Sequence, residues 1–265
     1  MNHDVRSNRG DSYRPVSHRA VWWLRWGGAA CFVGHGAFGV MTKEGWLPYF
    51  ALFGIGRDLA FQLMPVIGWL DIAMGLSLLV TLHPVLLGWM VVWTIFTAAL
   101  RPLSGESIWE FVERAANFTL PLALLALTWW SARPAGGTDG ESTISTGRYR
   151  VVWRVLTIGA VALLVGHGVL ELHQKAAFVV NAATIAPLTS GTLARGIGVL
   201  DLVLAVAIGA LGTPALGVVV AVWKLATESL FLLGGASAWE LVERGASFAI
   251  PAALACRARG GWRVR

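Results

Sequence analysis

The chain consists of long apolar runs separated by short polar breaks. Eight of these runs approach or reach the roughly 20 mainly apolar residues that cross a bilayer, and their apolar positions are continuous rather than alternating, which favours helices over barrel strands. The predicted spans are 21–42, 64–82, 84–100 and 109–130, followed by 151–173, 195–211, 213–232 and 239–256. The pattern therefore predicts an all-α fold, a polytopic transmembrane bundle of eight helices.

The two halves of the chain repeat one another. The segment WEFVERAANFTLP (109–121) recurs as WELVERGASFAIP (239–251), with eight of 13 positions identical and an offset of 130 residues. The segments IGWLD (67–71) and IGVLD (197–201) share that offset, and the GHG of 34–36 recurs at 166–168 with an offset of 132. A common register across separated motifs predicts a duplicated four-helix unit. Pro84 and Pro214, in matching tight connections, are expected to begin the third span of each half.

The predicted organisation is a polar N-terminal segment, a first repeat, a linker rich in Gly, Ser, Thr and Arg, a second repeat and a basic tail. These cover residues 1–20, 21–130, 131–150, 151–256 and 257–265. An even number of spans in each half gives both repeats the same orientation, related by an axis along the membrane normal. Thirteen of the 21 lysines and arginines lie in or beside the N-terminal segment, the linker and the tail. The positive-inside rule therefore places both termini in the cytoplasm, with the chain in a bacterial inner membrane.

Composition excludes the other broad classes. The chain is 56% hydrophobic and only 14% charged, whereas soluble domains carry about 25% charged residues and disordered chains have low hydrophobicity. The basic residues are dispersed over short segments that suit lipid headgroups rather than nucleic acid. Cys31 and Cys256 lack metal-site spacing, so no metal site is predicted. The tryptophans near span ends are expected to be interface anchors: Trp22, Trp23, Trp26, Trp46, Trp129 and Trp130.

Ionisable residues within or beside membrane spans are costly, and they are therefore functional candidates. Counting along the helices at about 1.5 Å per residue places these residues in the half of the bilayer opposite the termini, or just beyond it. The first-half candidates are His35, Lys43, Asp71, Arg101, Glu106, Glu110, Glu113, Arg114 and Asn117. The second-half candidates are His167, Lys175, Asp201, Glu228, Glu240, Glu243 and Arg244.

Helical spacing predicts some of the ion pairs. Glu110 and Arg114 are four residues apart with the acid first, which is the favourable order, and Glu240 and Arg244 repeat the arrangement. Glu113 then needs a partner. The partners expected from the same half are Lys43, Arg101 or His35 for Glu113, and Lys175 or His167 for Glu243. These pairs either form a functional site or lock the helices together by interhelical hydrogen bonds.

His35 and His167, each flanked by glycines, have two interpretations. They are packing residues where helices approach closely, or they are functional residues that ligate haem or a metal, contact a quinone or relay protons. The halves also differ, because Arg101 and Glu106 have no counterpart in the second half. That half gains Lys224 and Glu228, four residues apart in the less favourable order, as well as Glu171 and His173.

These features resemble the DoxX/DoxD-like superfamily of small four-helix membrane proteins. The resemblance is based on GHG followed eight residues later by Lys, on G-x-x-D in the second span (68–71 and 198–201), and on a short turn with Pro before the third span. It covers residues 20–130 and 150–256, as two copies. It implies a role in quinone-linked oxidation, in a membrane redox complex or in assembly, and it fixes no substrate.

Three functional hypotheses follow. The first is a redox-linked membrane subunit associated with quinone or haem, with a charged site in the outer half of the bilayer. The second is a transporter or permease for a small solute or for protons, since parallel repeats would enclose a charged central site. The third is a structural or assembly subunit that binds a membrane or periplasmic protein partner.

Overall fold

The computed structural model describes residues 16–131 and 141–257, with side chains described outside 130–148. Every regular element in these residues is a helix, as the sequence predicts. The first half contains α1 (His18–Val40), η1 (Glu44–Trp46), α2 (Leu47–Ala51), α3 (Arg57–Val80), α4 (Pro84–Leu103), α5 (Ile108–Glu113) and α6 (Ala115–Ser131). The second half contains α7 (Glu141–Leu172), α8 (Ala176–Ala183), η2 (Pro187–Thr189), α9 (Ser190–Leu211), α10 (Pro214–Leu233), α11 (Ala238–Glu243) and α12 (Gly245–Ala255).

Local sequence signals set several helix ends. Pro84 and Pro214 occupy the first turn of α4 and α10, where a missing backbone N–H costs nothing, so this prediction is confirmed. Ser107 and Ser237 cap α5 and α11, each accepting a hydrogen bond from the backbone N–H two residues later. Residues 141–150, which belong to the predicted linker, form the first turns of α7.

Five described stretches are long and apolar enough to cross a membrane: Arg57–Val80, Pro84–Leu103, Tyr149–Leu172, Pro187–Leu211 and Pro214–Leu233. They carry large exposed apolar side chains such as Val80, Val85 and Val206, which suit contact with lipid tails. These apolar helices fit an integral membrane protein. Helix α1 is not among the five, and it carries two arginines, two histidines and five glycines.

The fourth predicted span of each half is broken rather than continuous. The expected helix over 109–130 is divided into α5 and α6 at Arg114, and that over 239–256 into α11 and α12 at Arg244. At both arginines the backbone switches to hydrogen bonds between residues three apart. The same arginines donate Nη1–H to the carbonyl oxygens of Glu110 and Glu240, at 3.1 and 2.6 Å. A side chain that binds the carbonyl of its own preceding turn competes with the regular helical ladder.

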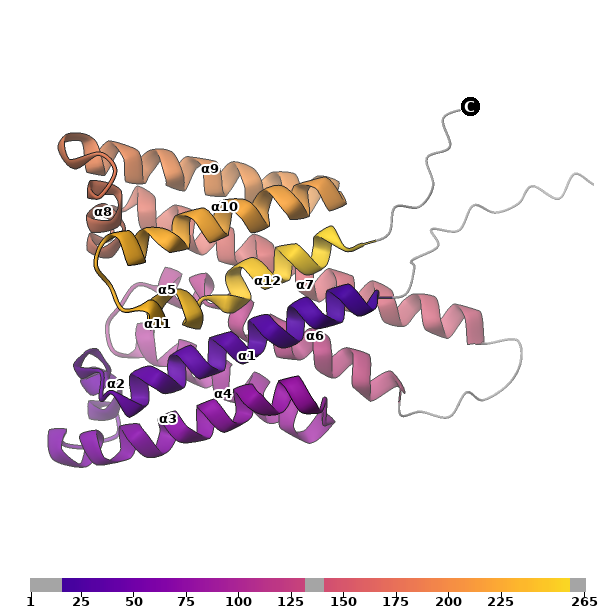
Figure 1. Cartoon of the computed structure of the whole chain (residues 1–265), viewed down its shortest axis with the longest axis horizontal. Helices are drawn as coiled ribbons and strands as arrows, with labels where there is room; N and C mark the ends of the chain where they lie inside the picture. The colour runs from indigo at the N-terminus through magenta and orange to yellow at the C-terminus, as the bar shows by residue number, and fades with distance from the viewer. Residues whose placement is uncertain (1–15, 132–140, 258–265) are drawn as a thin grey trace, which may run out of the picture.

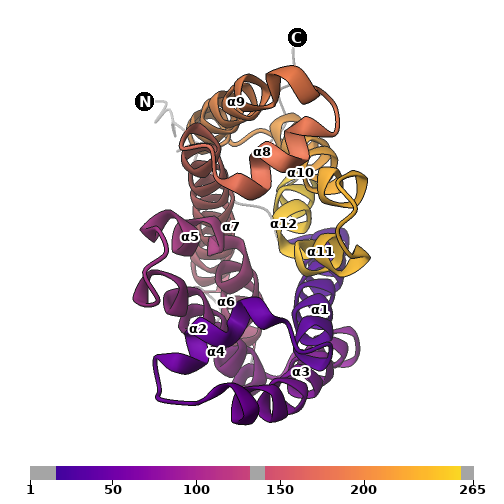
Figure 2. The same cartoon turned by 90° about the vertical axis from the view of Figure 1, so that its left-hand side faces the viewer.

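The first helix of each half packs against helices of the other half as well as against its own. Helix α1 packs against α3 of its own half and against α11 and α12 of the other, while α7 packs against α9 and against α5 and α6. Figure 2, which looks along the helices, shows α1 beside α11 and α12, and α5 and α6 beside α7. In Figure 1 the start of α1, the end of α6, the start of α7 and the end of α12 lie at one end of the bundle, and the short helices α2, α8 and α11 lie toward the other. Each half therefore completes the packing of the other.

Glycines make these crossings possible. A Cβ on Gly34 would lie 2.2 Å from the backbone N of Glu243, and a Cβ on Gly166 would lie 2.3 Å from the backbone N of Glu113. The first glycine of each GHG motif thus lets its helix touch the backbone of the other half, as small residues do at membrane helix crossings. The histidine that follows is held beside the charged residues of α5 or α11.

Replacing either of these glycines with alanine is expected to destabilise the bundle by about 1–3 kcal/mol, because backbone atoms cannot yield as a flexible side chain can. The variants are Gly34→Ala and Gly166→Ala, measured by thermal unfolding in mild detergent. Gly88→Ala and Gly196→Ala are the controls, since a Cβ at either of these helical positions meets nothing within 4 Å. Equal losses in all four variants would show that the crossings are not tight.

Candidate functional site

A large cavity lies among α1, α3 and α4 of the first half, and residues of α7, α11 and α12 from the second half complete its wall. Its volume of 350 Å³ is within the range of about 300–1,000 Å³ typical of small-molecule sites. One part of its wall is aromatic, formed by Phe32, Trp46, Tyr49, Phe50, Phe53, Trp93 and Phe96. The predicted site residues that line it are His35, Lys43, Asp71, Arg101, Glu113, Arg114, Asn117, His167, Glu243 and Arg244. The structure thus brings ten of the 16 predicted residues to one cavity.

His35 faces this cavity in a fixed orientation. Its Nδ1 lies 2.8 Å from Asp71 Oδ2, and Trp93 donates its indole N–H to Asp71 Oδ1 at 2.8 Å. The imidazole stacks on Trp46, with ring centroids 4.6 Å apart. Asp71 is 1% exposed, so these two partners satisfy a carboxylate that is costly to bury alone. With Nδ1 bound to the carboxylate, Nε2 is the nitrogen left for a ligand.

Close glycine packing also places this histidine. A Cβ on Gly36 would lie 2.4 Å from the Gly68 carbonyl oxygen, so α1 and α3 touch backbone to backbone one turn from Asp71. The GHG motif of α1 and the G-x-x-D motif of α3 therefore contact each other where these two helices cross. Packing is thus the role of the glycines, while the histidine side chain binds Asp71 beside the cavity.

A second polar group lies beside the cavity, formed by Tyr49 of α2, Arg101 in the last turn of α4 and Glu106 after that helix. The Tyr49 hydroxyl donates to Glu106 Oε1 at 2.5 Å, and Arg101 Nη1 donates to Glu106 Oε2 at 2.9 Å. Burial alone would raise the pKa of the Glu106 carboxyl, but the Tyr49 and Arg101 contacts outweigh it and hold that pKa below its usual value. Burial raises the pKa of the Tyr49 phenol to about 12. The glutamate is therefore an anion, and the tyrosine keeps its proton, at neutral pH.

Lys43 and Lys175 form ion pairs between the halves, and the expectation of partners within each half is wrong. Lys175 binds Glu110 at 2.7 Å and Glu113 at 3.3 Å, although these glutamates belong to the first half. Lys43 likewise donates to Glu240 of the second half at 2.9 Å. The cause is the exchanged packing described above, which places the ends of α7 and α1 beside the opposite half.

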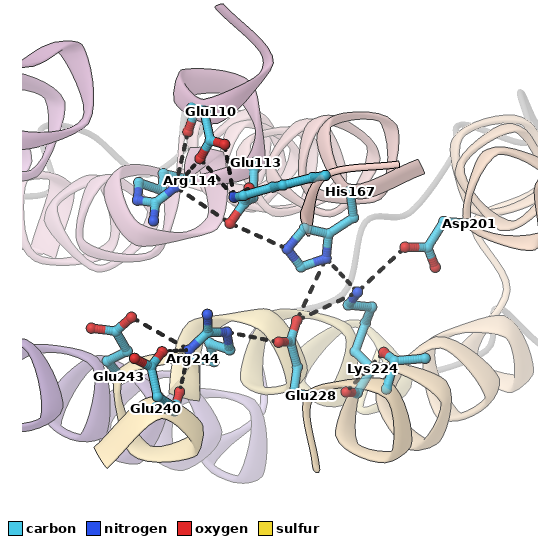
Figure 3. A network of polar contacts seen from close by, with 12 residues as sticks. Glu110, Glu113, Arg114, His167, Asp201, Lys224, Glu228, Glu240, Glu243 and Arg244 are labelled. Atoms are coloured by element: carbon cyan, nitrogen blue, oxygen red, sulfur yellow. Dashed lines mark hydrogen bonds and ion pairs between the residues drawn. The ribbon is translucent and has the colours of Figure 1, made fainter. Parts of the chain in front are cut away.

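The two predicted helical pairs are confirmed, and Figure 3 shows them facing one another. Arg114 lies 3.4 Å from Glu110, and Arg244 lies 2.6 Å from Glu240. Arg244 Nε also reaches Glu228 at 2.9 Å, which joins α11 to the charged residues inside the second half. Glu243 contacts Arg244 at 3.4 Å.

In the described part of the second half, charged side chains fill the space that matches the large cavity. Lys224 is 1% exposed; it binds His167 Nδ1 and lies 3.3 Å from Asp201 Oδ2 and 3.4 Å from Glu228 Oε1. With the offset of 130, its first-half counterpart is a threonine and that of Glu228 is an alanine, Thr94 and Ala98. A cavity of 10 Å³ remains there.

Some of these features were not predicted from the sequence. Lys224 stood out as an unusual charge, but its pairing with His167 was not foreseen. Trp46, expected as an interface anchor, is buried and stacks on His35 at the cavity wall, so that expectation is wrong. Trp22, Trp23, Trp26 and Trp129 are exposed, as anchors should be, and Trp130 lies outside the described side chains. The sequence signal for the buried Asp–Trp pairs is a spacing of 22 residues. It separates Asp71 from Trp93 in the first half and Asp201 from Trp223 in the second.

Haem ligation by the paired histidines does not fit this geometry. His167 Nδ1 is bound by Lys224, and Nε2 lies 3.6 Å from Glu113 Oε1, so neither nitrogen points into free space. Among the side chains that the structure describes, no group of three or more from His, Cys, Asp or Glu is placed to hold a metal ion. A quinone contact remains compatible with His35, whose Nδ1 is bound to Asp71 and whose Nε2 is left for a ligand.

Comparison of the chain with protein-family models, curated proteins and solved structures finds no match. The resemblance to the DoxX/DoxD-like superfamily therefore stays a prediction.

Proposed function

We propose that this protein is a redox-linked membrane subunit that binds a quinone headgroup in the first-half cavity. The observation that carries the proposal is the pairing of an aromatic wall with His35, held by Asp71 at one edge of that wall. A planar ring stacks on aromatic side chains, and a quinone carbonyl oxygen accepts a hydrogen bond from a protonated imidazole nitrogen. Because Nδ1 of His35 is held at Asp71, Nε2 is the imidazole nitrogen that is left to bind the ligand.

The charged side chains of the cavity favour a neutral ligand. Arg101, Arg114 and Lys43 each contact at least one glutamate, and Asp71 is satisfied by its own partners. An ionic ligand would have to break one of these pairs, whereas a neutral acceptor of hydrogen bonds leaves them intact.

The position of the cavity suits a ligand that is soluble in lipid. Residues of α3 and α4, both long and apolar enough to cross a membrane, form much of its wall. The exposed faces of these two helices carry apolar side chains, among them Val66, Trp69, Trp89 and Val92. A ligand with an isoprenoid tail can leave the tail among the lipids while its headgroup lies inside.

The proposal includes a topology of eight spans, arranged as two parallel four-helix repeats in a bacterial inner membrane with both termini in the cytoplasm. It is supported by the internal repeat and by the common end of the bundle at which the described chain ends lie. The cavity would then lie in the outer half of the bilayer. A membrane or periplasmic protein partner would exchange electrons with the bound quinone.

The test is saturable binding of decylubiquinone to the purified protein, followed by quenching of tryptophan fluorescence, since Trp46 and Trp93 line the cavity. His35→Ala is expected to weaken binding about tenfold, the equivalent of one hydrogen bond of about 1.4 kcal/mol. His83→Ala is the matched control, because His83 is exposed and does not line the cavity. Absence of saturable binding, or equal weakening in both variants, would refute the proposal.

A further inference from the structure

The small cavity of the second half is surrounded by ionisable side chains. His167, Glu171, Lys224 and Glu228 line its 10 Å³, together with Asn181. A space of about 10–15 Å³ holds one water molecule when polar partners surround it. The cavity is therefore the size of a single water molecule in contact with two carboxyl groups, an amine and an imidazole.

Two carboxyl oxygens at this cavity have no hydrogen-bond partner, Glu171 Oε2 and Glu228 Oε1. Glu228 is compensated by ion pairs with Lys224, His167 and Arg244 at 2.9 to 3.5 Å. Glu171 is 4% exposed, and within the described residues no cation lies within 4.0 Å of it. A buried carboxylate without a partner is far more costly than the neutral acid, so Glu171 is the group that favours a bound proton.

The charges around Glu171 lead to the same conclusion. Its own helix carries His167, and the linked residues around it are Asp201 of α9, Lys224 and Glu228 of α10, Glu113 of α5, Arg244 after α11 and Lys175 before α8. Arg114 also lies 3.3 Å from Glu113, so four acids, Glu171 included, face four lysines and arginines. These cations are shared with further glutamates: over this group and every residue that ion pairs link to it, eight acids face six lysines and arginines. A proton on Glu171 reduces this excess of negative charge.

His167 connects this site to the large cavity. Of the side chains that the structure describes, it is the only one that lines both cavities. Its Nδ1 is bound to Lys224, and its Nε2 lies 3.6 Å from Glu113 Oε1. Glu113 in turn lines the large cavity. Figure 3 shows Lys224, His167 and Glu113 in this order, linked by dashed lines.

We propose that the second half is a proton-holding site, with a proton stored on Glu171 and exchanged with the first-half cavity through Lys224, His167 and Glu113. Delivery to a bound quinone is the only part that rests on the proposed function. The first half lacks this arrangement, because His35 contacts Asp71 directly and no lysine stands between them.

The transfer balances without any other reactant. Lys224 gives a proton to His167 Nδ1, and the Nε2–H bond of the same ring breaks as its proton passes to Glu113. The O–H bond of the Glu171 acid breaks and returns a proton to the amine of Lys224 across the small cavity. Glu113 is then the neutral acid that faces the large cavity, and the reverse sequence restores the stored proton.

The stored proton is tested by infrared spectroscopy of the purified protein in mild detergent at pH 7. A protonated carboxylic acid shows a carbonyl stretch that a carboxylate lacks. We expect this band in the unmodified protein, its loss in Glu171→Gln and its displacement in Glu171→Asp. Glu240→Gln is the matched control, because Glu240 is bound by Lys43 and Arg244. A band that survives Glu171→Gln, or that is missing from the unmodified protein, overturns the proposal.

The route is tested by the rate at which the same band shifts after transfer into deuterated water. His167→Phe is expected to slow the shift at least tenfold, and His173→Phe, an exposed histidine at the end of the same helix, is expected to leave it unchanged. An unchanged rate in His167→Phe would overturn the route. Neither measurement uses a quinone, so their failure is distinguishable from a failure of quinone binding.

Discussion

Replacing Lys224 with threonine, the residue at the matching first-half position, is expected to destabilise the bundle by about 3–5 kcal/mol. Lys224 is the buried cation between Asp201 and Glu228, which are 0% and 1% exposed. Removing it leaves Asp201 with Trp223 as its remaining partner, and leaves Glu228 with His167 and Arg244. The measurement is the free energy of unfolding in mild detergent.

The double variant Lys224→Thr with Glu228→Ala is expected to regain at least half of that loss. It reproduces the first-half pair Thr94 and Ala98, and it frees His167 to bind Asp201 as His35 binds Asp71. Arg244 keeps Glu240 and Glu243 as partners. The control is Glu228→Ala alone, which leaves Lys224 paired with Asp201. Losses that simply add in the double variant would show that the two side chains do not act as a pair.

Replacing Lys175 with methionine is expected to cost about 2–3 kcal/mol, and the same change at Lys43 about 1 kcal/mol or less. Lys175 neutralises two glutamates whose side chains are 6% and 7% exposed, Glu110 and Glu113. Lys43 neutralises only Glu240, whose side chain is 17% exposed and which keeps Arg244 as a partner. Methionine preserves most of the chain length, so packing changes little between the two variants.

The two lysine variants are controls for each other, because they occupy matching positions in the two halves. Unfolding of both in the same detergent gives the comparison. Equal losses, or a larger loss for Lys43→Met, would contradict the asymmetry that the ion-pair geometry predicts. High salt should reduce the effect at Lys43 more than at Lys175, because the more exposed pair is screened more strongly.

The helical fold and many of its boundaries follow from the sequence, since Pro84 and Pro214 mark helix starts and the apolar runs leave few alternatives. The breaks at Arg114 and Arg244 do not follow from it, because they depend on side chains that bind the carbonyl of the preceding turn. A helical pattern records which residues share a face, and it does not record a competing hydrogen bond of this kind.

The residues of the candidate site could be predicted from the sequence, but the ion pairs between helices could not. Spacing along one helix is enough for Glu110 with Arg114, whereas the partner of Glu113 depends on which half α7 packs against. A sequence repeat carries no information on whether its first helix packs within its own copy or on the other. The cavity was also out of reach, because it depends on the size of side chains such as Thr94 and Ala98 after packing.

The exchanged first helices have a consequence for the origin of the chain. A single four-helix unit would leave the backbone around Gly34 exposed and Lys43 without a counter-ion. It would need a second, identical molecule to cover both. Joining two such molecules end to end makes the partnership permanent and removes the requirement that they stay alike. One half can then keep its cavity while the other fills the matching space with charged side chains. A symmetric pair thereby becomes a molecule whose two halves differ inside.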